Sequence, residues 1–170
     1  MPQVTLRQAT SPADIEVVRT LCWEYRDYLI NFSDELREAI SFVYGKADYT
    51  RLLESLEEKH KRPKGYILLA ELDGKPAGCG MTQALSDDDA EIKRVFVRQE
   101  ARKLGVASQL SQALVDQARV DGYKRVLLDT SRQFIGAQGL YEKLGFKQRG
   151  PYSELPPGFE KYLVFYQYTL

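Results

Sequence analysis

The segment from Glu91 to Val120, EIKRVFVRQEARKLGVASQLSQALVDQARV, predicts a strand, a glycine-containing turn and a helix in direct succession. The run of β-branched and aromatic residues at Val95–Val97 suits a strand, and the turn covers Arg102–Ala107. Beyond Gly105 the apolar residues recur at helical spacing, which gives the helix one apolar face for packing against a sheet. These residues are Val106, Ala107, Leu110, Ala113, Leu114 and Ala118. The turn therefore lies at the N-terminus of a helix.

A helix N-terminus of this kind suits an anion, because the backbone N–H groups of the first helical turn have no partner within the helix. A diphosphate is a natural ligand there. Gly105 and Ala107 leave the main chain accessible, and Arg102 and Lys103 add positive charge. Ordinary strand–helix units share these features, so spacing alone leaves a phosphate site and a purely structural turn as equal alternatives.

At these residues the sequence resembles the GNAT superfamily of N-acyltransferases. The signature of that family, Gln/Arg-x-x-Gly-x-Gly/Ala, is met by Arg102, Gly105 and Ala107. A second match, LYEKLGF at Leu140–Phe146, is similar to the late helix of the family and the strand that follows it. The resemblance extends from about Tyr66 to the C-terminus and is weak before that point.

Composition excludes several classes of protein. The 170 residues are 44% hydrophobic and suffice for one domain, 1–170, with its own core. Lys and Arg number 24 and Asp and Glu also number 24, so no overall field attracts nucleic acid or a membrane surface. Cys22, Cys79 and the single His60 form neither a disulfide framework nor a metal cluster. Without a signal-like or membrane-spanning apolar run, we expect a cytoplasmic, metal-free protein. Its oligomeric state stays open, with a homodimer as one alternative.

The predicted elements follow the order of a mixed α/β GNAT fold. A helix crossover joins 90–97 to 125–130, so these two strands must run parallel. The resemblance implies a mostly antiparallel, twisted sheet that splays between this parallel pair, flanked by about four helices. The expected strands are 4–7, 66–72, 77–82, 90–97, 125–130, 146–152 and 159–169. The expected helices are 11–32, 47–61, 106–121 and 131–145, the last one capped by Ser131.

The resemblance also implies a co-substrate, acetyl-CoA. Its pantetheine arm would enter the gap between the parallel strands and bond the free N–H and C=O groups of Val95, Phe96 and Val97. Its diphosphate would bind at the turn and the first helical residues, which are Arg102, Lys103, Leu104, Gly105, Val106, Ala107 and Ser108. Phe134 replaces an asparagine that is frequent in the family, so Arg132 or Gln133 is expected to supply the missing coenzyme contact.

Acyl transfer to an amine needs a base and an acid, because a lysine-type amine with a pKa near 10.4 is mostly protonated at neutral pH. By resemblance, Glu91 is the candidate base and Tyr141 the candidate acid that protonates the departing thiolate, while a strand N–H near Val97 meets the oxyanion. Two structural alternatives remain: Glu91 pairs with Lys93, or Tyr141 is a core residue. Strict alternation would place Glu91, Lys93, Val95 and Val97 on one strand face and Ile92, Arg94 and Phe96 on the other.

The acceptor site is the least defined part of the chain. Candidate contacts are Tyr44, Lys93, Arg94 and Tyr152, and a carboxylate held by Lys93 or Arg94 would favour a small amino acid. Tyr25, Tyr28 and Phe32 are interpreted as packing residues, with an acceptor pocket as the alternative.

We therefore expect an N-acetyltransferase that acts on a small primary amine or an amino-acid-like compound. The alternatives are a protein N-acetyltransferase and a non-catalytic acyl-CoA-binding module. A nucleotide-binding protein is disfavoured, because the sequence contains neither a P-loop nor G-x-G-x-x-G.

Overall fold

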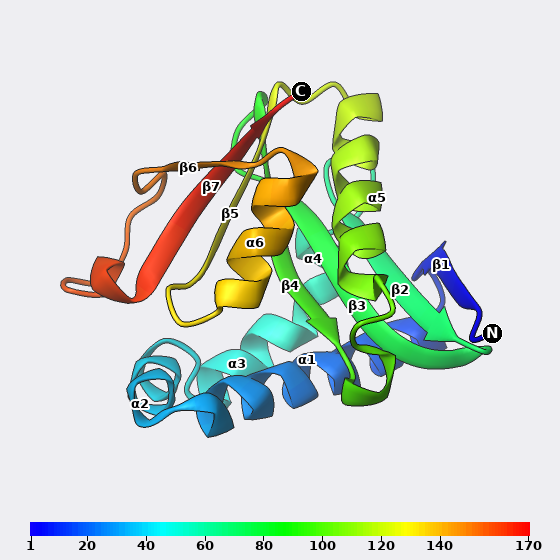
Figure 1. The fold of residues 1–170 in the computed structure, drawn as a ribbon, viewed down its shortest axis with the longest axis horizontal. Helices are drawn as coiled ribbons and strands as arrows, with labels where there is room; N and C mark the ends of the chain where they lie inside the picture. Colours follow the sequence, from blue (N-terminus) through cyan, green and yellow to red (C-terminus); the bar gives the residue numbers. More distant parts are fainter.

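The computed structural model describes all 170 residues and contains a seven-stranded mixed sheet with six α-helices (Figure 1). The strand order is β1-β2-β3-β4-β5-β7-β6. The strands are β1 (Val4–Gln8), β2 (Tyr66–Leu72), β3 (Lys75–Ala84), β4 (Asp89–Val97), β5 (Arg125–Ser131), β6 (Lys147–Arg149) and β7 (Leu163–Thr169). The helices are α1 (Pro12–Phe32), α2 (Asp34–Val43), α3 (Lys46–Glu54), α4 (Leu56–Lys59), α5 (Val106–Val120) and α6 (Ile135–Leu144).

Strands β4 and β5 form the parallel pair of the sheet, and all other neighbouring strands are antiparallel. The parallel pairing is short and ends where Glu91 faces Leu127. Both strands continue beyond this point, to Val97 and Ser131, without pairing to one another. The expected splay between the parallel strands is therefore confirmed, and it leaves backbone groups of both strands free toward the gap.

A bulge in β4 changes which side chains face which helix. Arg94 has a φ of +51°, and the register with β3 shifts nearby. As a result Ile92, Val95 and Val97 all pack into the core under α5, while Phe96 packs into the core on the opposite face. The strict alternation predicted for this strand is wrong, because the extra residue at the bulge reverses the facing of the residues that follow it.

The two faces of the sheet carry separate hydrophobic cores. On one face α5 and α6 pack against the sheet, and Leu110, Leu114 and Tyr141 belong to this core. On the other face α1, α3 and α4 pack against β2 and β3, with Leu21 and Leu53 among the fully buried residues. The diverging ends of β4 and β5 thus lie between helices that cover opposite faces (Figure 1).

The N-terminal half contains more helices than the sequence predicted. Helix α1 begins as expected, with a capping box between Ser11 and Asp14. The region 31–65, which gave few sequence signals, contains α2, α3 and α4. The helix expected at 47–61 is two helices, because the chain turns at Ser55, whose N–H donates to the Leu52 carbonyl in a 3₁₀ turn.

The C-terminal elements are shorter than predicted. Ser131 ends β5 and does not cap α6; its hydroxyl accepts from the N–H of Gln133, and the helix begins at Ile135. The strands expected at 146–152 and 159–169 contract to β6 and β7, and a 3₁₀ turn at Glu160–Tyr162 precedes β7.

Candidate active site

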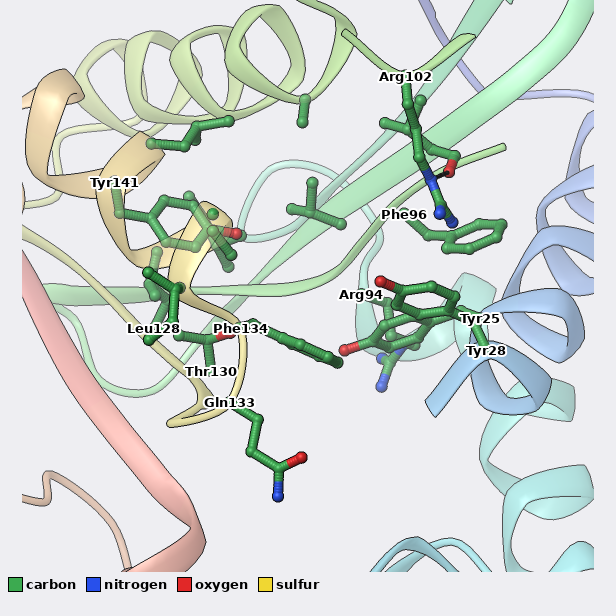
Figure 2. A pocket seen from close by; sticks show the side chains of 18 of the residues that line it. Tyr25, Tyr28, Arg94, Phe96, Arg102, Leu128, Thr130, Gln133, Phe134 and Tyr141 are labelled. Carbon is green, nitrogen blue, oxygen red and sulfur yellow. Dashed lines mark hydrogen bonds between the residues drawn. The ribbon is translucent and has the colours of Figure 1, made fainter. Parts of the chain in front are cut away.

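A cavity of about 670 Å³ opens where β4 and β5 diverge (Figure 2). Its walls come from α1, β4, β5, α6 and the turn before α5. Fourteen of its 21 lining residues are hydrophobic, and a few polar groups lie among them. A mostly apolar cavity with a few convergent polar groups is the usual form of a site for a small ligand.

The turn before α5 lies at the helix N-terminus, where the sequence predicted it. Gly105 is the residue before the first helical turn and has a φ of +77°, a left-handed conformation that favours glycine. No side chain caps the helix, so the first N–H groups of α5 keep their capacity to bind an anion.

The residues of this turn are divided between the cavity and the protein core. Arg102, Lys103 and Ala107 line the cavity. Arg102 is held in place, because its Nε donates to the Val97 carbonyl at 3.0 Å and its guanidinium lies 4.5 Å from the ring centre of Tyr28. The four other predicted coenzyme contacts of this segment do not line the cavity. Leu104 lies at the surface and Val106 in the core, and Gly105 and Ser108 also lie outside the cavity wall.

The predicted strand contacts and the predicted acid meet in the same cavity. Val95, Phe96 and Val97 line it from β4, and Tyr141 lines it from α6. Tyr141 is 8% exposed and packs edge-on against Phe146. Burial raises the pKa of Tyr141 to about 12, although the neighbouring Ser111 hydroxyl acts in the opposite direction. This phenol is both a core residue and a cavity residue, so the two interpretations of it are compatible.

Glu91 lies beside the cavity and not in its wall. Its Oε1 accepts from Gln83 Nε2 at 2.9 Å, and its Oε2 accepts from the Tyr152 hydroxyl at 2.6 Å. Lys93 Nζ lies 3.7 Å from Glu91 Oε1, so the ion pair considered as an alternative is present. Glu91 is therefore a buried carboxylate with a hydrogen-bond donor on each oxygen.

Asp129 is a functional candidate that the sequence analysis missed. It lines the cavity from the end of β5, and its Oδ2 lies 3.4 Å from the Tyr152 hydroxyl. Burial raises the pKa of Asp129. One signal was available in the sequence, since Asp129 directly follows the apolar run 126–128 at the carboxyl end of a parallel strand, where ligands bind in open α/β sheets.

The candidate acceptor residues take different positions. Arg94 lines the cavity, whereas Lys93 pairs with Glu91, and Tyr152 joins Glu91 to Asp129 without lining the cavity itself. Tyr44 also lies outside the cavity wall, with its ring centre 5.0 Å from that of Tyr49.

Aromatic residues of α1 contribute more to the cavity than the sequence analysis favoured. Tyr25, Tyr28 and Phe32 all line it, as does Phe134 from the opposite wall (Figure 2). The rings of Phe32 and Phe134 meet edge-on at 4.8 Å. Tyr25 and Tyr28 thus have both roles, because they line the cavity and also pack against the Phe96 ring.

Arg132 and Gln133, the expected substitutes for a coenzyme contact, both bond another part of the chain, and of the two only Gln133 lines the cavity. Both bind the carboxylate of Glu35 at the start of α2. These contacts join α2 to the β5–α6 loop beside the Phe32–Phe134 pair.

A sheet that splays between two parallel strands, next to an uncapped helix N-terminus, is the architecture of an acyl-CoA-dependent N-acyltransferase. The chain belongs to the acetyltransferase (GNAT) family, whose family model matches residues 26–146. It is accordingly an acyltransferase.

Known relatives agree with this assignment. An IAA acetyltransferase of Azospirillum brasilense is 29% identical over 133 residues, which cover 78% of this chain and 85% of that protein. The human N-acetylaspartate synthetase is 31% identical over 100 residues, or 58% of this chain, and the match spans 33% of the human protein. A GNAT acetyltransferase of Elizabethkingia anophelis, solved with acetyl-CoA bound, shares the fold with a TM-score of 0.61 at 19% identity, covering 98% of each chain. None of the six helices is long and apolar enough to cross a membrane.

Proposed function

We propose that this protein transfers the acetyl group of acetyl-CoA to the primary amine of a small, amino-acid-like acceptor, with residues 1–170 acting as one domain. The observation that carries the proposal is the position of Tyr141, whose phenol is buried in the wall of the cavity where β4 and β5 diverge. Any thioester lying between the two strands would have this phenol beside it.

The coenzyme site is proposed at the open edge of β4 and at the N-terminus of α5. Beyond Glu91 the edge of β4 facing β5 is unpaired, so the main chain of Val95–Val97 can bond the pantetheine amides as a neighbouring strand would. The residues from Leu104 to Ser108, at the N-terminus of α5, would hold the diphosphate through their N–H groups, with Arg102 and Lys103 supplying charge.

Tyr141 serves as the acid in the proposed reaction. The amine nitrogen attacks the thioester carbonyl carbon, a C–N bond forms, and the C–S bond then breaks. Because the pKa of Tyr141 is raised to about 12, its phenol stays protonated at neutral pH and donates to the sulfur as negative charge develops there. A main-chain N–H near Val97 would stabilise the oxyanion of the tetrahedral intermediate.

Glu91 serves as the base, acting through Tyr152 and Asp129. Asp129 is the member of this group that lines the cavity, so it would receive the proton lost by the amine. Tyr152 contacts both carboxylates and can pass a proton on to Glu91. The raised pKa of Asp129 favours this role, because burial makes its carboxylate a stronger base.

A small acceptor is favoured over a protein lysine because the cavity is bridged beside α2. Glu35 binds Arg132 and Gln133, and Phe32 contacts Phe134, so contacts from α1 and α2 reach the β5–α6 loop. The name of the human relative, N-acetylaspartate synthetase, also supports an amino acid acceptor.

The test is release of free thiol from acetyl-CoA in the presence of amines, amino acids and peptides, combined with calorimetric measurement of acetyl-CoA binding. We expect release that depends on one class of small amine. Tight acetyl-CoA binding without acceptor-dependent release across the panel would support the non-catalytic module, and absence of coenzyme binding would overturn the proposal.

A further inference from the structure

Arg94 carries a buried positive charge that no acidic residue neutralises. Its residue surface is 6% exposed, and the guanidinium forms none of the ion pairs of the structure. Its side chain makes one hydrogen bond, from Nη2 to His60 Nε2 at 2.8 Å, and its buried Nε has no partner. An unpaired buried charge carries a large desolvation penalty, so a counterion is expected when the site is occupied.

His60 cannot supply that counterion. Its Nδ1 lies 2.8 Å from the Thr82 carbonyl, an acceptor, so Nδ1 carries the proton and Nε2 accepts from Arg94. Burial, and after it the charge of Arg94, lowers the pKa of His60 to about 4, which keeps the ring neutral near pH 7. His60 therefore fixes the orientation of the guanidinium without offsetting its charge.

Other charged groups near Arg94 are also already committed. Lys93 is a second cation, and it pairs with Glu91. Asp129 lines the same cavity but contacts Tyr152. Apart from Arg102 and Lys103 of the turn before α5, the cavity therefore contains one further cation, the Arg94 guanidinium, and one carboxylate, that of Asp129.

The position of Arg94 separates it from the proposed diphosphate site. Its bulge conformation, with φ at +51°, places the guanidinium beside His60, which follows α4, on the sheet face covered by α1, α3 and α4. Helix α5, whose N-terminus would hold the diphosphate, covers the opposite face. Figure 2 shows Arg94 and Arg102 in different parts of the pocket. The anion that Arg94 binds is thus a different group from the coenzyme phosphates.

We propose that Arg94 binds the carboxylate of the acceptor, and that the acceptor is therefore an amino acid or another small amine that carries a carboxylate. A guanidinium suits this group because its planar donors match the two oxygens of a carboxylate. Asp129, in the same cavity, would receive the ammonium end of the same molecule. The assignment of the anion to the acceptor rests on the proposed N-acetyltransferase function, whereas the anion site rests on Arg94 alone.

The test compares amino acids with their amides, for example L-alanine and L-alaninamide, as acceptors for wild type, Arg94→Gln and Arg94→Lys. The ratio of kcat/KM for acid over amide should fall on the order of 10²-fold in Arg94→Gln, because one partner of a desolvated charge pair is lost. The ratio in Arg94→Lys should lie between those of wild type and Arg94→Gln, because lysine keeps the charge and loses the planar pair of donors.

Arg26→Gln is the matched control. Arg26 is also 6% exposed, but it bonds the Tyr44 carbonyl and does not line the cavity, so its replacement should leave the acid-to-amide ratio unchanged. An equal fall in both variants would indicate general disruption of the fold and would overturn the specific role of Arg94.

Two further arms separate the proposals from one another. Calorimetry with unreactive coenzyme A present should detect binding of the acid and not of the amide, and binding of the acid should disappear in Arg94→Gln. If the acid binds in this Arg94-dependent way but no acceptor is acetylated, the anion site stands and the proposed reaction fails. If turnover occurs with an acid-to-amide ratio insensitive to Arg94→Gln, the inference fails and the proposed reaction stands. If only the use of succinyl-CoA as donor depends on Arg94, the carboxylate belongs to the donor and the assignment to the acceptor is wrong.

Discussion

The hydroxyl of Tyr152 donates a 2.6 Å hydrogen bond to Glu91 Oε2. The same hydroxyl lies 3.4 Å from Asp129 Oδ2, so a residue from the loop before β7 links a carboxylate of β4 to a carboxylate of β5. Burial raises the pKa of Tyr152 strongly, and the two carboxylates add to the effect, so the bridging phenol keeps its proton. Glu91 therefore has a bonded route to the cavity although it does not line it.

The first prediction concerns this linked group. If Glu91 is the base, Glu91→Gln should lower kcat on the order of 10²-fold with little change in the KM for acetyl-CoA, because the glutamine keeps the shape and loses the basicity. Tyr152→Phe should lower kcat by about tenfold, since it interrupts the link to Asp129. Steady-state kinetics of thiol release measures both effects.

Lys93→Met is the control that distinguishes a base from an ion-pair partner. Lys93 lies 3.7 Å from Glu91 Oε1, so its removal breaks the ion pair and leaves the carboxylate in place. If Glu91 only pairs with Lys93, the two variants should be equally impaired, and that result would contradict a role for Glu91 as base.

The second prediction concerns the coenzyme turn. Gly105→Ala places a side chain at φ +77°, which should cost roughly 1–2 kcal/mol of stability. The added Cβ would meet only Gln109 Nε2 at 3.8 Å, so backbone strain is the main cause. The KM for acetyl-CoA should rise several-fold as the turn relaxes. Thermal unfolding and kinetics at varied acetyl-CoA concentration measure the two effects.

Gly139→Ala provides the matched comparison. Gly139 lies inside α6, where an added Cβ meets nothing within 4 Å, so alanine should raise stability by up to about 1 kcal/mol and leave the KM for acetyl-CoA unchanged. A fall in stability of similar size in both variants would show that backbone conformation does not distinguish these two glycines.

The third prediction concerns pH and stability. His60 has a folded-state pKa of about 4 against an ordinary value of 6.5, so the unfolded chain binds more protons between these values. Stability should therefore fall as the pH drops from about 6.5 to about 4, by about 3 kcal/mol from this group. His60→Gln should show a flatter dependence in urea unfolding over that range. Parallel curves for the two proteins would contradict a buried neutral histidine.

The central strand, turn and helix could be predicted, because each of these elements is determined by residues that are close together in the sequence. Gly105 adopts the left-handed conformation at the start of α5. The bulge at Arg94 was not predicted, because it depends on contacts with the neighbouring strand. A clue existed in β3, where a Cβ at Gly78 would lie 2.6 Å from the Phe96 carbonyl oxygen. Glycine inside a strand often marks such a close approach.

The acceptor side was less predictable for a related reason. Asp129, His60 and Tyr25 are far apart in the sequence, and no local spacing connects them to Arg94. Their common environment arises only when the bulge places the Arg94 side chain on the α1 face. The short helices of 31–65 similarly depend on tertiary packing, since isolated helices of nine or ten residues are marginal in water.

The most direct test of the account is thiol release by Tyr141→Phe beside wild type, with Tyr168→Phe as control. Tyr168 packs against Phe146 and lies outside the cavity, so its hydroxyl should not matter for the reaction. We predict that Tyr141→Phe lowers kcat on the order of 10²-fold while acetyl-CoA still binds, and that Tyr168→Phe retains wild-type activity. Wild-type turnover by Tyr141→Phe would contradict the claim that this phenol is the acid.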